Sequence, residues 1–304
     1  MAKLIGIAPC YNEIQKGHLH RFLKNAPKLV DGLVLLDDAS TDGSYELMCS
    51  ATPNVIRNKK NMFVRELFNQ QRLIDTALEI YPDLTHLINL NIDTTFTPVC
   101  FREGKALLHQ ACDSFGDKYP MFFIREIHLW RSTAWWRCDG AWRWKEAERI
   151  YCRRDKLEIK NRWYRGLHIS KDVADFDDCL HLTNVPGYHD VAGIHWGFST
   201  RRDIESKVKN YLSLEDWRKV PCPDNFKSHS VYSLMDEYDL SIRATHPSWF
   251  GEEVYEDSIR ELRKPKKISY YPLLQEYNVA KAECYKNHFK MITQFYNETE
   301  EYYE

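Results

Sequence analysis

The chain has 304 residues, of which 43% are hydrophobic and 28% charged, so it is long enough for one large or two small globular domains. Its formal net charge of -2 argues against a generic nucleic-acid binder. The 9 cysteines are odd in number and form no Cys-x-x-Cys pair, which favours reduced thiols over a disulfide framework or a zinc site.

Strands and helices alternate along the first third of the chain. A short buried strand at residues 3–8 is stopped by Pro9, and the apolar run at 87–92 is the last strand of the series. Asp42 or Ser44 is a natural N-cap for the second helix. The other predicted elements are a helix at 18–26, a strand at 32–36, a helix at 45–49, a strand at 55–57 and a helix at 64–80. This alternation predicts the α/β class, with a doubly wound, mostly parallel sheet and helices on both faces.

The remaining two thirds of the chain are less regular. We expect a helix at 99–111 and a strand at 121–130, followed by a region dense in Trp and Arg, an acidic stretch and a glycine-rich turn that contains histidine. Further helices are expected at 201–217, 253–263 and 277–295. We therefore predict one domain over residues 1–204, with halves 1–98 and 99–204, and a largely helical C-terminal accessory region over 205–304.

Asp93 directly follows the last apolar strand of the series. A carboxylate at the carboxyl end of a buried parallel strand points into the crevice where open α/β sheets bind ligands. There it can hold a hard divalent cation, which can neutralise a diphosphate. The alternative is that Asp93 only ends the strand or caps the next element. Asp38, in the polar turn after the second strand, can accept a hydrogen bond from the N3–H of a pyrimidine or from a ribose hydroxyl.

The polar turns after the first two strands contain neither G-x-G-x-x-G nor G-K-[ST], the glycine-rich loops that bind phosphates. A Rossmann dehydrogenase and a P-loop enzyme are therefore disfavoured. The phosphates of a nucleotide would instead be neutralised by a cation, or by Arg65 or Arg72 from the helix at 64–80. The alternative for both arginines is a solvated helix face.

Three motifs, in this order and spacing, resemble glycosyltransferase family 2, which has the GT-A fold. They are Pro9-x-Tyr11-Asn12-Glu13, Leu36-Asp37-Asp38-x-Ser40-x-Asp42-Gly43 and Leu90-Asn91-x-Asp93. The resemblance covers residues 3–98 strongly and extends weakly to residue 200. It implies an inverting transferase that uses a nucleotide-diphosphate sugar and a divalent cation, usually manganese or magnesium.

The resemblance also implies roles for individual residues. The nucleoside would be held by Pro9, Tyr11, Asn12, Glu13 and Asp38. Asn91 would face the ribose, Asp93 the metal and Arg72 the diphosphate, so that residues 1–98 form the nucleotide-sugar-binding half and 99–204 the acceptor half. The chain departs from the family because Asn91 replaces the first acid of the Asp-x-Asp motif. One charge fewer near the cation is expected to weaken metal affinity or to shift the work to other ligands.

His195 is the best candidate for an additional metal ligand. Family members often carry a His in an aromatic-rich turn well past the acidic motif, and His195-Trp196-Gly197-Phe198 resembles that turn. Imidazole suits manganese better than magnesium or calcium. The alternative is a buried histidine bonded to the backbone beside Trp196, and His189 is a weaker candidate for the ligand.

Inverting transfer needs a general base that takes the proton of the acceptor hydroxyl. Asp139 is our first choice for this catalytic residue, because it lies among aromatic residues able to stack on sugar rings. Glu126 and Asp178 are the alternatives, and Asp139 could instead pair with a nearby arginine in a structural ion pair. The tryptophans around it are as readily core residues as a carbohydrate platform.

The sequence thus predicts a metal-dependent glycosyltransferase with a UDP- or GDP-type sugar donor, a glycan or glycoconjugate acceptor, Mn²⁺ or Mg²⁺ as cofactor and no nucleic-acid partner. Two other classes stay open. One is a catalytically inactive nucleotide-sugar or glycan-binding protein of the same fold, for which Asn91 is the hint; the other is a nucleotidyltransferase, whose usual glycine-rich loop is missing. No apolar run approaches the ~18 residues of a membrane span. The first apolar run is also too short for a signal peptide, so we expect a cytoplasmic protein, with peripheral attachment to a membrane left open.

Overall fold

The computed structural model describes residues 1–62, 66–101, 106–130, 133, 135–138, 146–153, 179–197, 199, 203, 242–246 and 249–250. Its strands are β1 (Leu4–Cys10), β2 (Gly32–Asp37), β3 (Val55–Arg57), β4 (His86–Asn89), β5 (Thr94–Phe96), β6 (Met121–His128), β7 (Trp135–Arg137), β8 (Glu146–Cys152), β9 (Leu180–His181), β10 (Ala192–His195) and β11 (Ile242–Ala244). Its helices are α1 (His18–Leu29), α2 (Ser44–Ala51), α3 (Glu66–Ile80) and α4 (Ala106–Phe115), with 3-10 turns η2 (Pro98–Phe101) and η5 (Leu182–Asn184). The helices predicted at 201–217, 253–263 and 277–295 and the acidic stretch at 172–178 lie outside the described residues.

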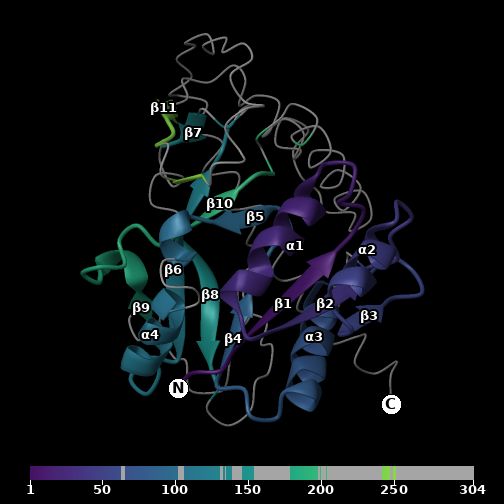
Figure 1. Cartoon of the computed structure of the whole chain (residues 1–304), viewed down its shortest axis with the longest axis horizontal. Helices are drawn as coiled ribbons and strands as arrows, with labels where there is room; N and C mark the ends of the chain where they lie inside the picture. Colours follow the sequence, from purple (N-terminus) through teal and green to yellow (C-terminus); the bar gives the residue numbers. More distant parts are fainter. Residues whose placement is uncertain are drawn as a thin grey trace, which may run out of the picture. The chain divides into compact units, whose positions relative to one another are not determined.

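Nine of the strands form one mixed sheet (Figure 1). Its order is β3-β2-β1-β4-β8-β6-β10-β5, and β9 pairs with β6. The parallel pairs are β1 with β2 and β4, β2 with β3, and β6 with β9 and β10. β8 runs antiparallel to both β4 and β6, and β5 runs antiparallel to β10. The predicted α/β class and mostly parallel sheet are confirmed, whereas the antiparallel strands make the sheet mixed.

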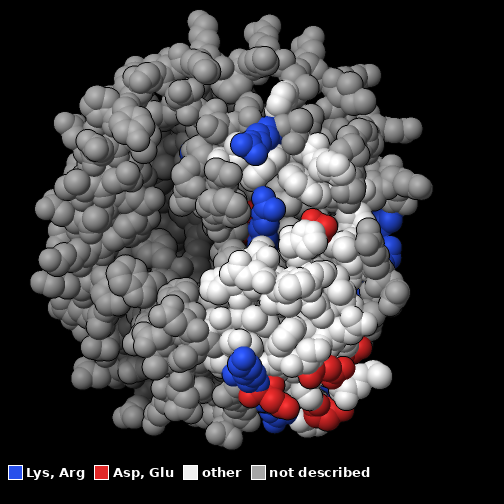
Figure 2. Space-filling view, turned by 90° about the vertical axis from the view of Figure 1, so that its left-hand side faces the viewer, with Lys and Arg blue, Asp and Glu red and all other residues white. Residues whose placement is uncertain are grey.

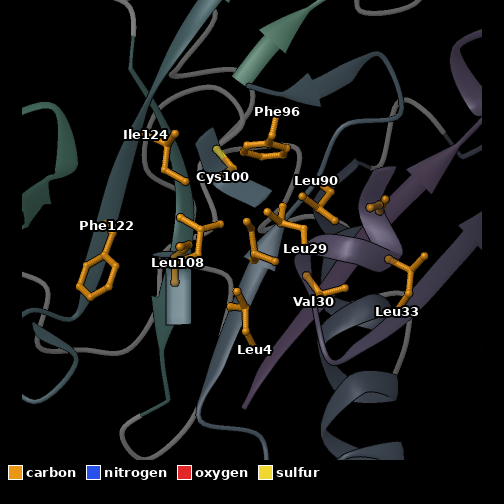
Figure 3. Close-up of a cluster of buried hydrophobic side chains, with 14 of the residues drawn as sticks. Leu4, Leu29, Val30, Leu33, Leu90, Phe96, Cys100, Leu108, Phe122 and Ile124 are labelled. Atoms are coloured by element: carbon orange, nitrogen blue, oxygen red, sulfur yellow. The ribbon is translucent and has the colours of Figure 1, made fainter. Parts of the chain in front are cut away.

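Helices cover both faces of the sheet, because successive strand residues alternate between two hydrophobic clusters. On β1, Leu4 and Ala8 belong to the first cluster, while Ile5 and Ile7 belong to the second. The first cluster also contains buried residues of α1, α2 and α4, and the second contains buried residues of α3. Figure 3 shows side chains of the first cluster, contributed by strands, α1 and α4. Burial of these apolar surfaces is the dominant favourable term in folding.

β1 runs through Pro9 to Cys10, so the prediction that Pro9 ends the strand is wrong. Cys10 O accepts a hydrogen bond from Asp38 N on the β2 side, whereas Ile7 O accepts one from Leu90 N on the β4 side. Alternate residues of a strand face the same neighbour, so Pro9 faces the β4 side as Ile7 does. The pairing with β4 ends at Ile7, and the missing N–H of Pro9 therefore costs the sheet no hydrogen bond.

The N-cap prediction for the second helix is also wrong. The N-cap of α2 is Gly43, whose φ of 91° lies in the left-handed region that glycine adopts at little cost. Asp42 Oδ1 instead accepts a hydrogen bond of 3.0 Å from the backbone N–H of Ser44, the first residue of the helix. α1 continues beyond residue 26 and through Pro27, because its last residue, Leu29, is fully buried in the first cluster.

The element predicted at 99–111 is divided into η2 and α4 in the structure, with residues 102–105 between them outside the described part. β4 ends at Asn89, before the predicted end of the strand, and the chain turns at Ile92 and Asp93 into β5. His195 is the last residue of β10 rather than part of a turn. For β4 and β10, pairing with distant strands decides where the element begins or ends.

The described residues of Met1–Thr200 and of Ile242–Arg260 belong to one compact unit. β11 pairs with β7 antiparallel, with Ile242 opposite Arg137. Residues 242–244 therefore belong with the sheet-containing unit, although they lie in the stretch assigned to the accessory region. The domain boundaries at 1–204 and 205–304 stay a prediction.

Figure 2 shows a face of the molecule on which most of the described surface is uncharged. Acidic and basic side chains lie side by side at its lower edge, so opposite charges attract one another locally there. Within the described ranges, no helix is long and apolar enough to cross a membrane.

Candidate functional site

The carboxyl ends of β1, β2 and β4 lie at one edge of the sheet, since β1 pairs in parallel with both neighbours. The three sequence motifs follow these strands: the first ends β1, the second ends β2, and the third comes directly after β4. The fold therefore brings the motif side chains to the edge at which open α/β sheets bind ligands.

The turns after β1 and β2 are tied together by hydrogen bonds. Ser40 Oγ accepts from Asn12 N at 3.0 Å, and Asn12 Oδ1 accepts from Thr41 N at 2.8 Å. Asp42 Oδ2 accepts from Ile14 N at 3.0 Å. Asn12 has a φ of 52°, a left-handed conformation that Asn tolerates better than most residues. The Asn12 side chain thus shapes the loop that carries the first motif.

Glu13 is engaged by two side chains from the start of α1 and the turn before it. Its carboxylate oxygens lie 2.8 Å from Lys16 Nζ and 2.8 Å from His18 Nδ1. These contacts give Glu13 a structural function at this turn, beside the nucleoside contact that the resemblance implies. Pro9 is half-buried within β1, whereas Tyr11 is 39% exposed and can present its ring to a ligand.

Asp38 directly follows β2 and is 4% exposed. Asn58 Nδ2 donates to its Oδ1 at 2.6 Å, and Met62 N donates to the same oxygen at 2.8 Å. Both of these bonds orient the carboxylate through one oxygen. Oδ2 is then the atom through which Asp38 can accept a hydrogen bond from a nucleoside.

Arg72, on α3, supports Asp38 indirectly. Its Nη1 donates to Asn58 Oδ1, and Asn58 Nδ2 also donates to Asn69 Oδ1 at 2.8 Å. The Arg72 guanidinium lies 5.9 Å from the centroid of the Phe68 ring. Arg72 therefore positions Asn58, and a diphosphate contact would use the other N–H groups of its guanidinium.

Asp93 lies in the turn between β4 and β5, and His195 ends β10. β5 and β10 pair antiparallel with His195 opposite Thr94. This register brings Asp93 Oδ2 to 3.3 Å from His195 Nε2, and Trp196 N donates to Asp93 O at 2.7 Å. The two side chains are 18% and 8% exposed. The structure thus brings together the two residues that the sequence analysis named as metal ligands.

His195 also packs against residues of β6. The ring centroids of His195 and His128 are 4.6 Å apart, and His128 Nε2 lies 3.2 Å from Glu126 Oε2. The sequence predicts Glu126 only as an alternative base and indicates no role for His128. Their i, i+2 spacing on a predicted strand was the available signal, since it places both side chains on one face.

The donor atoms present fit a manganese or magnesium site that is shared with a substrate. Carboxylate and imidazole are donors that manganese accepts, and cations in nucleotide enzymes take further ligands from substrate phosphates and water. Within the described part of the chain, no group of three or more His, Cys, Asp or Glu side chains is arranged to hold a metal ion by itself. The remaining ligands would therefore come from a diphosphate, from water or from Asn91, which is half-buried beside Asp93.

Arg21, on α1, is a residue that the sequence analysis missed. Its guanidinium carbon lies 4.4 Å from the centroid of the Trp196 ring, and Trp196 Nε1 donates to Thr95 Oγ1 at 2.8 Å. Arg21 thus brings a positive charge from the helix after the first motif to the residue next to His195. No motif marked it, because the contact depends on how α1 packs beside β5 and β10.

The other candidate residues are not brought to this cluster by the contacts that the structure describes. His189 is 68% exposed at its side chain and lies 3.2 Å from Asp190. Asp139, Asp178 and Arg65 lie outside the described residues.

The cysteines in the described part of the chain are free thiols. Burial raises the pKa of the Cys100 thiol to about 11, and burial likewise raises the pKa of Cys10, at the end of β1, far above its usual range. Both groups are therefore neutral near pH 7, which makes them poor nucleophiles and poor metal ligands.

No protein-family model matches the chain, and no curated protein matches it either. Solved structures do match. The crystal structure of S. aureus TarS 1-349 in complex with UDP is 16% identical over 42% of this chain and 36% of that chain, with a TM-score of 0.32. The crystal structure of S. aureus TarS 1-349 is 11% identical over 77% of this chain and 72% of that chain, with a TM-score of 0.34.

A third match is the mannosyltransferase PcManGT from Pyrobaculum calidifontis in complex with GDP-Man and Mn²⁺. It is 13% identical over 77% of this chain and 70% of that chain, with a TM-score of 0.38. The chain is thus similar to these three structures only at a distance, in sequence and in backbone alike. It covers 36% of the length of the first structure named.

Proposed function

We propose that this chain is a metal-dependent, inverting glycosyltransferase that moves a sugar from a nucleotide-diphosphate donor to a hydroxyl group of a glycan or another acceptor. The observation that carries the proposal is the 3.3 Å approach of Asp93 Oδ2 and His195 Nε2 at the ligand-binding edge of the sheet. It joins the last motif of the glycosyltransferase resemblance to the histidine that the same resemblance marks as a ligand.

Asp93 and His195 would hold the cation, Mn²⁺ or Mg²⁺, together with oxygens of the donor. When bound, the cation would supply positive charge that stabilises the departing nucleotide diphosphate. Asn91 contributes an amide oxygen in place of a carboxylate and would bond a ribose hydroxyl. His195 therefore takes over part of the work that the missing acid would have done.

The nucleoside would bind against the two tied turns. Asp38 Oδ2 would accept a hydrogen bond from the base or ribose, since Asn58 and Met62 already orient the carboxylate through Oδ1. Tyr11 would cover the base with its exposed ring, while Pro9, Asn12 and Glu13 would frame it. Arg72 would reach the diphosphate with the N–H groups that do not hold Asn58.

Asp139 would be the general base that takes the proton from the acceptor hydroxyl as it attacks the sugar. Glu126 suits this task less well, because its carboxylate is 5% exposed and lies beside His128, where an acceptor hydroxyl has little access. Trp136 is buried in a hydrophobic cluster and is a core residue, so among the described tryptophans near Asp139 the half-buried Trp135 would stack on the acceptor sugar.

A calorimetric panel of UDP- and GDP-sugars, each titrated with and without Mn²⁺, tests the proposal. It predicts that one donor binds with an affinity that rises when Mn²⁺ is present, and that this donor is hydrolysed or transferred. Manganese-dependent binding without turnover, with a range of glycan acceptors, would instead identify the inactive binding protein that Asn91 suggests. Failure of every donor to bind would overturn the proposal.

A further inference from the structure

Asp93 is the outermost of four side chains that contact one another in sequence, and the innermost of them is buried within the sheet. β6 and β10 pair in parallel, with His128 opposite His195 and Glu126 opposite Gly193. Because alternate residues of a strand share a face, Glu126 and His128 lie on the same face as His195. Three neighbouring strands, β6, β10 and β5, therefore align Glu126, His128, His195 and the turn that carries Asp93.

The distances between successive side chains in this series are short. His128 Nε2 lies 3.2 Å from Glu126 Oε2, and the His128 and His195 ring centroids are 4.6 Å apart with the planes at 44°. His195 Nε2 then lies 3.3 Å from Asp93 Oδ2. The exposed fraction of the side chain is 18% for Asp93, 8% for His195, 1% for His128 and 5% for Glu126. Only the outer end can meet a ligand, so the inner two residues act through His195.

Close packing of β10 against β5 keeps Asp93 and His195 beside each other. A Cβ atom on Gly193 would come within 3.0 Å of Thr94 Cγ2, so the glycine allows the two strands this approach. Trp196 N donates to Asp93 O at 2.7 Å. The backbone around His195 is thereby fixed, and the His128 ring packs against its imidazole.

A buried carboxylate is tolerated in a protein interior when it is paired, and its field is screened much less than at the surface. Outer partners of a metal-binding histidine, most often hydrogen-bonded to it, fix its ring orientation, and their loss typically costs ~10- to 100-fold in metal affinity. Here His128 contacts the His195 imidazole by ring packing. We propose that Glu126 and His128 are positioning residues that hold the His195 imidazole toward Asp93 and thereby set the affinity of this site for a divalent cation. The inference rests on the proposed function, in which Asp93 and His195 hold that cation.

The test is calorimetric titration of Mn²⁺ into the full chain in the presence of UDP or GDP. Glu126→Gln keeps the size of the side chain and removes its charge, and His128→Phe keeps a ring against His195 and removes the contact with Glu126. Each is expected to weaken Mn²⁺ binding ~10-fold or more. The affinity for the nucleoside diphosphate without Mn²⁺ is expected to stay unchanged, which a general loosening of the fold would not allow.

A matched control exists at the other end of the sheet. Asp31 Oδ2 lies 2.7 Å from His109 Nε2 and accepts from Leu4 N at the start of β1, so this pair is also a carboxylate beside a largely buried histidine. Asp31→Asn is expected to lower the melting temperature without changing the Mn²⁺ affinity.

The possible outcomes separate the two proposals. If the wild-type chain binds no Mn²⁺ with either nucleotide, the proposed function fails and the inference falls with it. If the wild type binds Mn²⁺ and both β6 variants bind it equally well, the inference alone is overturned. It is also overturned if Asp31→Asn weakens Mn²⁺ binding as much as Glu126→Gln does. Should Glu126→Gln fail to fold, His128→Phe carries the same comparison.

Discussion

Asp93 Oδ2 lies 3.3 Å from His195 Nε2, and this contact joins two segments that are far apart in the sequence. It is held by the backbone as well as by the side chains, because Trp196 N donates to Asp93 O and His195 pairs with Thr94 across the two strands. Changing either side chain therefore leaves the turn and the strand in place. Substitutions at this pair report on ligand binding rather than on folding.

Asp38→Ala is expected to destabilise the chain and to abolish nucleotide binding. It removes the acceptor of two donors, Asn58 Nδ2 and Met62 N, in a site that is 4% exposed. The loss of a buried acceptor of this kind costs about 1–3 kcal/mol. Urea unfolding at pH 7 measures the free energy of unfolding, and calorimetry with UDP and GDP measures the binding.

Asp38→Asn and Asp83→Ala are the controls for this substitution. Asn keeps an oxygen for the two donors, so Asp38→Asn is expected to retain most of the stability while weakening nucleotide binding. Asp83 pairs with Lys3 at 2.5 Å but is 69% exposed, and Asp83→Ala is expected to leave the free energy of unfolding nearly unchanged. Full nucleotide affinity in Asp38→Asn would contradict the assignment of Asp38 to the nucleoside.

Arg57→Ala is expected to destabilise the chain by about 2–3 kcal/mol, because the buried Asp37 carboxylate loses its cationic partner and is left with the long hydrogen bonds from Ser40 N. Asp37 is fully buried, and its Oδ2 lies 2.9 Å from Arg57 Nε. Arg57 Nη2 also donates to Ser40 O at 3.0 Å, and its guanidinium lies 4.3 Å from the Tyr45 ring centroid. Urea unfolding measures this loss. Arg57→Lys keeps the positive charge but lacks the planar guanidinium with its several N–H donors, so its free energy of unfolding is expected to lie between those of the wild type and Arg57→Ala. An unchanged unfolding midpoint in Arg57→Ala would show that the hydrogen bonds from Ser40 N are enough to stabilise the buried Asp37 carboxylate.

His86 makes the stability of the chain depend on pH. Burial lowers the pKa of His86 from 6.5 to about 4, with the nearby His109 also lowering it and Asp113 and Asp117 opposing the shift. Below pH 6.5 the unfolded chain binds a proton at His86 that the folded chain does not bind until about pH 4. The contribution of His86 to the free energy of unfolding is therefore largest above pH 6.5, and the free energy of unfolding falls by up to about 3 kcal/mol as the pH drops to 4.

Urea unfolding of wild type and His86→Gln at several pH values between 7 and 4 tests this dependence. The difference in the free energy of unfolding between the two proteins is expected to shrink as the pH falls, because only the wild type loses the histidine contribution. His20→Gln, at an exposed position, is expected to follow the wild-type curve. If the difference in the free energy of unfolding between wild type and His86→Gln stays constant with pH, the pKa of His86 is not lowered in the folded chain.

Much of the N-terminal sheet could be predicted because its signals are local. The strand at 55–57 has the predicted bounds, and β1, β2 and α3 occur where runs of apolar residues or helical spacing predicted them. Polar motifs at the ends of these strands also lie at one edge, as the parallel pairing requires. These features depend on residues that are close in the sequence.

The rest depends on pairing between distant segments, which single-sequence patterns do not encode. The insertion of β8 between β4 and β6 brings together strands separated by long stretches of chain. For the same reason, His195 was expected in a turn, since only its pairing with β5 and β6 makes it part of a strand. The roles inferred for His128 and Arg21 escaped the sequence analysis because they arise from register and helix packing.

In the proposed function, Asp93 and His195 jointly hold a divalent cation for a nucleotide-diphosphate donor. Calorimetric titration of Mn²⁺ in the presence of UDP or GDP, on wild type, Asp93→Asn, His195→Gln and the double variant, tests this role most directly. Each single variant is expected to bind Mn²⁺ at least ~10-fold more weakly than the wild type, and the double variant to bind it little worse than the weaker single variant. His189→Gln, at an exposed position, is expected to bind Mn²⁺ as the wild type does. Wild-type affinity for Mn²⁺ in Asp93→Asn, or equal donor binding with and without Mn²⁺ in the wild type, would contradict this role.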